Sequence, residues 1–178
     1  TLFALFLAAL PMTQTQRRIP WNSTSSALTS LALFVLVVLA GVGTAVAVRP
    51  PVVQGERGID EMRVATYNIH GGYDEFYNTD LEAIARTIQE SGANIVLLQE
   101  VEAGRLTSFG VDQSLWLARR LGMDRRFYAT NEGLQGLAVL SRIPIAFDDG
   151  RLLSSIATQT GVQRVQVLPN PDTVVTLY

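Results

Sequence analysis

Three polar residues lie at the ends of two apolar segments, and their types could do chemistry together. Asn68 and His70 fall in Arg63-Val-Ala-Thr-Tyr-Asn-Ile-His-Gly-Gly72, and Glu100 falls in Asn94-Ile-Val-Leu-Leu-Gln-Glu-Val101, about thirty residues later. Buried parallel strands are nearly continuous in Val, Ile and Leu, and ligands of such sheets gather beyond the carboxyl ends of the strands. We therefore expect these three side chains at the carboxyl edge of a parallel sheet, where an enzyme would present its site.

A carboxylate at a strand end suits a hard cation. Mg²⁺ takes one or two carboxylates and keeps its other positions for water, so a single Glu is a sufficient protein anchor. The same residues also allow a plainer interpretation. Glu100 could be a solvated strand end, Asn68 beside two glycines a turn former, and His70, the only histidine, a structural or exposed side chain.

The helices that would position these residues have clear start and stop signals. The capping box Thr79-Asp-Leu-Glu82 predicts a helix start, and Gly92 predicts its end. Asp112 predicts the cap of a second helix that runs through Arg120 and ends at Gly122. Both segments carry apolar residues at helical spacing; they are Leu81, Ile84, Ala85 and Ile88 in the first and Leu115, Leu117, Ala118 and Leu121 in the second.

The remaining apolar runs predict strands, so the domain alternates between the two element types and belongs to the α/β (α+β) class. Asp148-Asp149-Gly150 is interpreted as a hairpin turn. The predicted strands cover residues 62–68, 94–99, 126–129, 137–140, 162–168 and 174–178.

An uncharged apolar stretch precedes this domain. Residues 27–48 would extend about 33 Å as a helix, which matches the roughly 30 Å of a bilayer core. The apolar region of a cleaved signal peptide is shorter and opens nearer the chain start, and a buried helix of this length would be unusual without a polar face. We therefore interpret residues 27–48 as a transmembrane helix. Residues 1–10 are apolar but too short to span, and are interpreted as the tail of an earlier span or an interfacial segment.

The distribution of arginine predicts the orientation of this helix. Arg17-Arg18 lie in residues 11–26 and only Arg49 lies on the other side, which makes residues 11–26 a cytoplasmic loop by the positive-inside rule. Residues 49–58, with two prolines, form a linker. The globular domain of residues 59–178 is then expected outside the cytoplasm, on a single-pass or multi-pass protein of the cell membrane. The absence of cysteine fits either compartment.

The charge of the domain disfavours nucleic acid as a partner. From Glu56 onward the chain holds 11 Arg, no Lys and 16 Asp and Glu, a net charge of −5. Nucleic-acid-binding domains usually carry a basic surface. A polyanionic partner is therefore less favoured.

Three blocks of the sequence resemble the endonuclease/exonuclease/phosphatase superfamily, which includes DNase I, exonuclease III, neutral sphingomyelinases and inositol phosphatases. The blocks are Tyr67-Asn-Ile-His-Gly-Gly72, Asn94-Ile-Val-Leu-Leu-Gln-Glu-Val101 and Gly136-Leu-Ala-Val-Leu-Ser-Arg-Ile-Pro-Ile145. They occur in the family's order and cover roughly the N-terminal half of its domain. The first block, the stretch from Val111 to Gly122 and the preceding apolar helix resemble a membrane-anchored branch, related to the C-terminal domain of proteins that remodel GPI-anchor lipids.

The resemblance implies a four-layer α/β sandwich of the DNase I-like type, truncated here and preceded by a transmembrane helix. It implies Glu100 and Asn68 as ligands of Mg²⁺, with Mn²⁺ as an alternative, and Asn68 and His70 as catalytic residues. The cation would neutralise phosphoester oxygens that gain charge while water attacks. Gln99 is expected to hold Glu100 in position without being a metal ligand itself. Arg142 is expected either to meet a phosphate or to lie in a surface turn.

The family's general-base His, its Asp-x-Asn pair and its terminal Asp-His pair have no counterparts here, so we expect a truncated domain that is inactive alone. The functional hypothesis is a membrane-anchored, metal-dependent phosphodiesterase or phosphatase acting on phospholipid or glycolipid headgroups. The alternatives are a nuclease or sugar-phosphate phosphatase of the same fold, and a non-catalytic membrane-anchored module. The coding sequence after Tyr178 would discriminate among them, and the sequence does not predict the oligomeric state.

Overall fold

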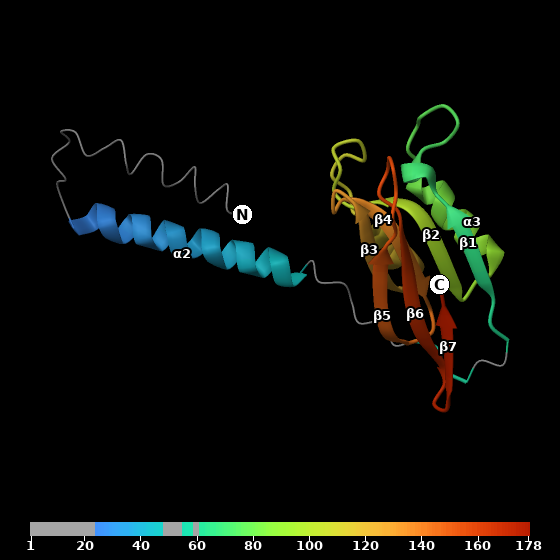
Figure 1. Cartoon of the computed structure of the whole chain (residues 1–178). Helices are drawn as coiled ribbons and strands as arrows, with labels where there is room; N and C mark the ends of the chain where they lie inside the picture. Colours follow the sequence, from blue (N-terminus) through green and yellow to red (C-terminus); the bar gives the residue numbers. More distant parts are fainter. Residues whose placement is uncertain (1–23, 48–54, 59–60) are drawn as a thin grey trace. The chain divides into compact units, whose positions relative to one another are not determined.

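The computed structural model describes residues 24–47, 55–58 and 61–178. The chain divides into two compact units, Thr1–Arg49 and Pro50–Tyr178, which are considered separately (Figure 1). The expectations for residues 1–10, for most of the loop at 11–26 and for most of the linker at 49–58 lie outside the described residues.

The described part of the first unit is one helix, α2 (Thr24–Ala47). Its segment Leu28–Ala47 has a mean hydropathy of 2.4, and none of the segment is buried. This exposure argues against the core helix of a soluble domain. The length and composition of α2 suit a membrane span, and a signal sequence near the N-terminus would meet the same criteria.

The second unit contains two sheets. The first has the order β1-β2-β4-β3, with β1 and β2 parallel and the other pairs antiparallel. The second has the order β5-β6-β7 and is antiparallel throughout. The strands are β1 (Val64–Asn68), β2 (Ile95–Glu102), β3 (Asp124–Asn131), β4 (Gln135–Ser141), β5 (Ile145–Leu152), β6 (Gly161–Asn170) and β7 (Thr173–Leu177).

Each face of the first sheet is covered, which explains the apolar runs in its central strands, residues 95–98 of β2 and residues 137–140 of β4. Val96 and Leu98 of β2 pack in a core with the helices α3 (Leu81–Ser91) and α4 (Gln113–Leu121). Ile95 of the same strand packs in a second core with Val165 and Val167 of β6. Within residues 61–178 these elements form three layers: helices, first sheet and second sheet. The α/β class is confirmed, and the expected four-layer sandwich is found in part.

The helix caps confirm one predicted start and correct the other. Asp112 caps α4 by accepting a hydrogen bond from the backbone N–H of Leu115 at 2.9 Å. The predicted capping box at Thr79 is wrong, because Asp80 caps α3 through a 2.8 Å bond from the N–H of Ala83. Glu82 is thereby placed too early in the helix to complete a capping box. The predicted helix stops are confirmed, since Gly92 and Gly122 both adopt the left-handed conformation.

Asp148-Asp149-Gly150 is not a hairpin turn but the middle of β5, and the prediction is wrong at this point. Arginines on other strands form ion pairs with the two carboxylates. Arg126 of β3 pairs with Asp148 at 2.9 Å, and Arg164 of β6 pairs with Asp149 at 2.6 Å. Gly150 lies against the ring of Tyr128, where a Cβ atom would come within 2.4 Å of the ring. This glycine therefore serves a close approach between the sheets rather than a turn.

Candidate active site

The parallel pairing of β1 and β2 brings the two sequence motifs to one edge of the first sheet. Asn68 is the last residue of β1 and lies opposite Gln99 of β2. The pairing continues one step further, because the N–H of Ile69 donates to the carbonyl of Gln99 at 3.1 Å. Glu100, the next residue of β2, therefore lies beside the end of β1.

Glu100 occupies a bulge in β2. The register against β4 shifts between Leu98, which pairs with Ala138, and Val101, which pairs with Gly136. The extra residue lets Leu98 and Val101, three positions apart, both pack in the core on the helix side of the sheet. Glu100 has a φ of 54°, a left-handed conformation that costs a non-glycine residue about 1–2 kcal/mol. Strain of this kind concentrates at functional sites.

The three predicted residues form one hydrogen-bonded cluster. The amide nitrogen Nδ2 of Asn68 donates to Oε1 of Glu100 at 2.9 Å. The Nδ1 atom of His70 lies 3.2 Å from Oε2 of the same carboxylate. The side chains remain accessible, with 45% of Glu100 and 70% of His70 exposed. Both oxygens of the carboxylate are thus oriented by neighbours while one side stays open to a ligand.

A tight turn after β1 brings His70 to Glu100. Oδ1 of Asn68 accepts the backbone N–H of His70 at 2.9 Å, and His70 itself has a φ of 51°. The turn continues as the short helix η1 (His70–Gly72). Gly72 has a φ of 81°, and a Cβ there would lie 2.8 Å from Nε2 of Gln113. Only glycine satisfies both the conformation and the space at this position.

Gln99 supports the site differently from the expectation. Its Nε2 donates to Oγ1 of Thr66 on β1 and to the carbonyl of Leu97, both at 3.0 Å. Gln99 therefore ties β1 to β2 next to the cluster, and no hydrogen bond between the side chains of Gln99 and Glu100 is found in the described part of the chain.

Gln113 is a site-supporting residue that the sequence interpretation missed. Its side chain is 2% exposed, and its Nε2 donates to the carbonyl of Gly71 at 2.6 Å. Its Oε1 accepts the backbone N–H of Glu102 at 2.9 Å. One buried amide thus joins the turn that carries His70 to the strand that carries Glu100. The available signal was a polar residue in line with Leu117 and Leu121, on the apolar face of the helix.

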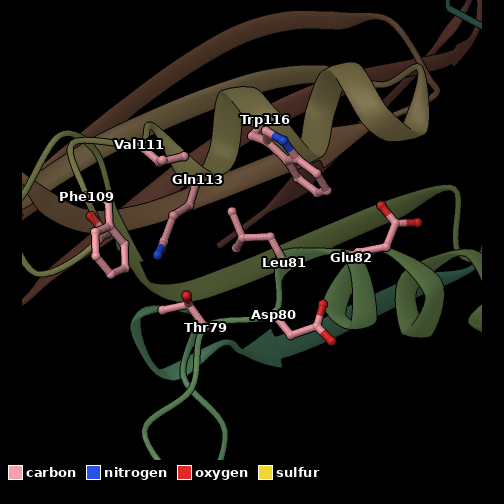
Figure 2. Close-up of a pocket in the computed structure, with 9 residues that line it drawn as sticks. Thr79, Asp80, Leu81, Glu82, Phe109, Val111, Gln113 and Trp116 are labelled. Atoms are coloured by element: carbon pink, nitrogen blue, oxygen red, sulfur yellow. The ribbon is translucent and has the colours of Figure 1, made fainter.

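Beside Gln113 is a pocket of about 270 Å³, lined by residues at the starts of α3 and α4 and in the loop before α4. Figure 2 shows Gln113 on α4, with Trp116 above Leu81 on one side and Phe109 at the edge of the pocket. Asp80 and Glu82 lie on the α3 side of this pocket (Figure 2), and the lining of the pocket includes no residue of the Asn68–His70–Glu100 cluster.

The cluster opens into a polar groove of about 640 Å³. Glu100 and Arg105 are the charged residues that line it. Arg105 forms ion pairs with Glu132 at 2.7 Å and with the buried Glu102 at 3.6 Å. The other lining residues are Asn68, Gln99, Thr130, Asn131, Gln135, Gly136, Leu137, Thr158, Gln159, Thr160 and Gly161.

Arg142 lies at the opposite end of the sheet. Its backbone N–H donates to the carbonyl of Asn94, the residue before β2 begins, at 2.8 Å. Of its two expected roles, the structure therefore favours the surface turn over a contact to a phosphate in the groove.

The donors at the cluster fit a hard cation that keeps most of its water. Among residues 24–47, 55–58 and 61–178, no three His, Cys, Asp or Glu side chains are grouped to hold a metal. The cluster instead offers the carboxylate of Glu100 and the amide oxygen of Asn68, which retains a second lone pair beyond its bond to His70. Mg²⁺ is usually held by one or two carboxylates and several waters.

A family model for the endonuclease/exonuclease/phosphatase family matches residues 65–177. The chain belongs to this family. Members of the endonuclease/exonuclease/phosphatase family are generally Mg²⁺-dependent phosphoesterases and typically use a divalent metal. The matched region begins in β1 and ends with β7, so it contains the whole Asn68–His70–Glu100 cluster.

Two solved structures of family proteins are similar to this chain. One is an endonuclease/exonuclease/phosphatase from Beutenbergia cavernae DSM 12333, with 25% identity and a TM-score of 0.52 over 65% of this chain and 37% of that one. The other is a family protein from Leptotrichia buccalis C-1013-b, with 18% identity and a TM-score of 0.48 over 60% of this chain and 50% of that one. The chain thus spans about a third to a half of the length of these relatives.

Proposed function

We propose that this domain is part of a Mg²⁺-dependent phosphodiesterase or phosphatase that α2 anchors to a membrane, and that acts on phospholipid or glycolipid headgroups. The observation that carries the proposal is the Asn68–His70–Glu100 cluster, presented on a strained bulge at the mouth of a polar groove. Family membership supports phosphoester hydrolysis as the reaction class.

In this proposal Glu100 and Asn68 hold the cation with their oxygens. Mg²⁺, when bound, supplies positive charge to phosphoester oxygens that become more negative during hydrolysis. Asn68 keeps the carboxylate of Glu100 in place by the 2.9 Å bond to Oε1. It also holds the turn that brings His70 to Glu100, so the side chain of Asn68 positions both Glu100 and His70.

His70 is proposed to contact the attacking water or a hydroxyl group of the substrate. A carboxylate only accepts hydrogen bonds, so the contact with Oε2 of Glu100 requires the hydrogen on Nδ1 of His70. This leaves Nε2 of a neutral imidazole as an acceptor on an exposed ring. Nε2 is then available to accept a hydrogen bond from water or from a substrate hydroxyl.

Two features support a lipid headgroup as the substrate. The domain has a net charge of −5. Among the residues that line the groove, the positive charge comes from Arg105, which is already paired with carboxylates. This charge distribution does not favour a long polyanion such as DNA. A substrate at a membrane surface is also consistent with the apolar helix α2 of the same chain. We further propose that the domain lies outside the cytoplasm, as the arginine distribution predicts.

The test is hydrolysis by the full-length protein with sphingomyelin, GPI-type lipids, duplex DNA and soluble sugar phosphates. We expect Mg²⁺-dependent turnover of a lipid and its loss in Glu100→Gln, which keeps the shape of the side chain but removes the charge. Glu90→Gln is the matched control, because Glu90 is an exposed residue of α3 away from the groove.

Four outcomes would contradict parts of the proposal. Preferred cleavage of DNA would contradict the lipid substrate and indicate a nuclease. Preferred cleavage of sugar phosphates would contradict it as well and indicate a sugar-phosphate phosphatase. Unchanged turnover in Glu100→Gln would remove Glu100 from the metal site. No turnover of any phosphoester by the full-length protein would favour a non-catalytic membrane module.

A further inference from the structure

Five large apolar side chains project from three loops of the domain. Phe76 and Tyr77, on the loop of residues 73–79, are 73% and 80% exposed. Leu106 and Phe109, on the loop of residues 103–111, are 95% and 81% exposed, and Ile156, between β5 and β6, is fully exposed. We call these five residues the apolar rim. Exposed apolar groups gathered at one place on a surface mark an interaction site.

The first loop is built to hold its two aromatic residues outward. Oδ1 of Asp74 accepts the N–H groups of Phe76 and Asn78, each at 2.8 Å. The bond from Asn78 is the main cause that holds the pKa of Asp74 below its usual range. Tyr77 has a φ of 61°, which is an outlier for a bulky residue. An ordered backbone thus keeps this strained ring largely exposed, with a tilted contact to the ring of Tyr73 at 6.5 Å between the ring centroids.

The second loop repeats the arrangement. Phe109 has a φ of 56°, and its N–H donates to the carbonyl of Leu106 at 3.1 Å. Gly110 closes the loop by donating to the carbonyl of Arg105 at 2.8 Å. The hydroxyl of Tyr73 in the first loop donates to the carbonyl of Thr107 in the second. The two loops are therefore joined, and each exposes a strained aromatic residue.

The loops of the rim lie at the same end of the domain as the candidate active site. The first loop directly follows the turn with His70, and the second follows the strand with Glu100. Arg105 of the second loop and Thr158 of the β5–β6 loop line the groove itself. Figure 1 shows these loops at one end of the domain, with the β6–β7 turn at the other end.

We propose that the apolar rim inserts into the surface of a lipid bilayer and brings the groove to the headgroups, an inference that rests on the proposed function. Aromatic and aliphatic side chains partition to the bilayer interface, where each buried one contributes favourable transfer free energy. A fluid interface accommodates separate protruding tips, whereas a protein partner would need a matching pocket for each. The rim loops carry Asp74, Glu75 and Arg105, which favours zwitterionic over anionic lipid.

The position of α2 in the sequence is compatible with this docking. The N–H of Glu56 is bound to the carbonyl of Arg142, at the end of the domain opposite the rim, and from Ala47 to Glu56 the extended chain reaches at most about 30 Å. With α2 in the bilayer, Glu56 would stay within this distance of the surface, so the tether raises the local concentration of lipid at the rim.

Because the protein contains no cysteine, single labels test the proposal directly. Phe76→Cys and Phe109→Cys are labelled with an environment-sensitive dye in the full chain, in phosphatidylcholine vesicles. We expect a blue shift and strong quenching by nitroxide-bearing lipid at both positions. Val174→Cys is the matched control, since Val174 is 57% exposed on β7, near the β6–β7 turn, and its dye should behave as in water.

The outcomes separate this inference from the proposed function. Water-like spectra at positions 76 and 109 would overturn rim insertion, whatever the enzyme hydrolyses. A blue shift without lipid quenching would also overturn it, in favour of a protein partner. In the active full-length protein, Phe76→Ser combined with Phe109→Ser should lower turnover of vesicle lipid by about tenfold or more, since two buried rings are lost, but not turnover of a soluble analogue. Equal loss on both substrates would contradict the proposal.

Discussion

Gln113 and Gly71 are joined by a buried 2.6 Å hydrogen bond, from the side-chain amide of the one to the carbonyl of the other. The oxygen of the same amide binds the N–H of Glu102. A side chain on α4 therefore fixes the spacing between the two backbone segments that carry His70 and Glu100. Positioning of this kind decides whether separate catalytic groups act together.

Gln113→Leu should destabilise the domain and disturb the cluster. The substitution leaves the carbonyl of Gly71 and the N–H of Glu102 without partners in a buried place, and each such group costs about 1–3 kcal/mol. Urea unfolding should therefore show a loss of about 2–6 kcal/mol. The backbone amide signals of His70 and Glu100 should shift in the NMR spectrum.

Gln163→Leu is the control for this experiment. Gln163 is 5% exposed on β6, but its side-chain nitrogen and oxygen have no hydrogen-bond partner in the described part of the chain. Removing an unsatisfied buried amide should leave stability unchanged or raise it. If Gln113→Leu were as well tolerated as Gln163→Leu, Gln113 would not be holding the site.

Replacing Glu100 by glycine should relieve the backbone strain at the bulge while removing metal binding. Glu100 adopts a φ of 54°, which glycine accepts without steric cost. Glu100→Ala also removes the carboxylate but keeps the strain, so Glu100→Gly should be more stable than Glu100→Ala by about 1 kcal/mol. Calorimetry with Mn²⁺ should show that both variants lose binding. Equal stability of the two variants would mean that the bulge is relaxed.

The sequence predicted which residues meet at the site, but not how the chain brings them together. Asn68 and Glu100 could be placed at one edge because uninterrupted apolar runs indicate buried parallel strands. The bulge at Glu100 could not be predicted, because it depends on pairing with β4, which lies about forty residues further along the chain. Gln113 was missed for the same reason, since a helix pattern does not reveal which distant backbone groups need a partner.

Local signals failed where contacts from elsewhere in the fold decided the structure. Asp149 and Gly150 look like turn residues, yet Arg164 neutralises the first and the ring of Tyr128 fills the space beside the second. Thr79 and Asp80 are both good caps, and the choice between them depends on where the preceding loop ends. Thr79 pairs with Tyr73 in a short bridge and is therefore still part of that loop.

The ion pair between Glu82 and Arg120 should make the packing of α3 on α4 depend on pH and salt. The hydrogen bond from Arg120 lowers the pKa of Glu82, and the same bond raises the pKa of Arg120. A lowered carboxylate pKa stabilises the fold above the unfolded-state pKa, and the contribution is lost as the pH falls through the folded-state pKa.

The free energies of unfolding of the wild type and of Glu82→Gln, measured in urea, should therefore differ at neutral pH. They should converge in acid, below the ordinary glutamate pKa of 4.5. Because the pair is exposed, high salt should reduce the difference as well. A difference that stays constant from neutral pH to acid would show that the charge of Glu82 does not contribute.

Arg105→Ala should destabilise the domain, mainly because it leaves the buried carboxylate of Glu102 without its cation. Arg105 is the cation beside Glu102, a carboxylate that is 5% exposed and accepts a 2.9 Å bond from the hydroxyl of Thr107. Without the arginine this charge remains buried with one hydrogen bond, and we expect a loss of about 1–3 kcal/mol in urea unfolding. Adding Glu102→Gln removes the stranded charge, so the double variant should recover part of the loss. Arg105→Ala alone would be harmless if the guanidinium only bound Glu132 at the surface, and the double variant would then show no recovery.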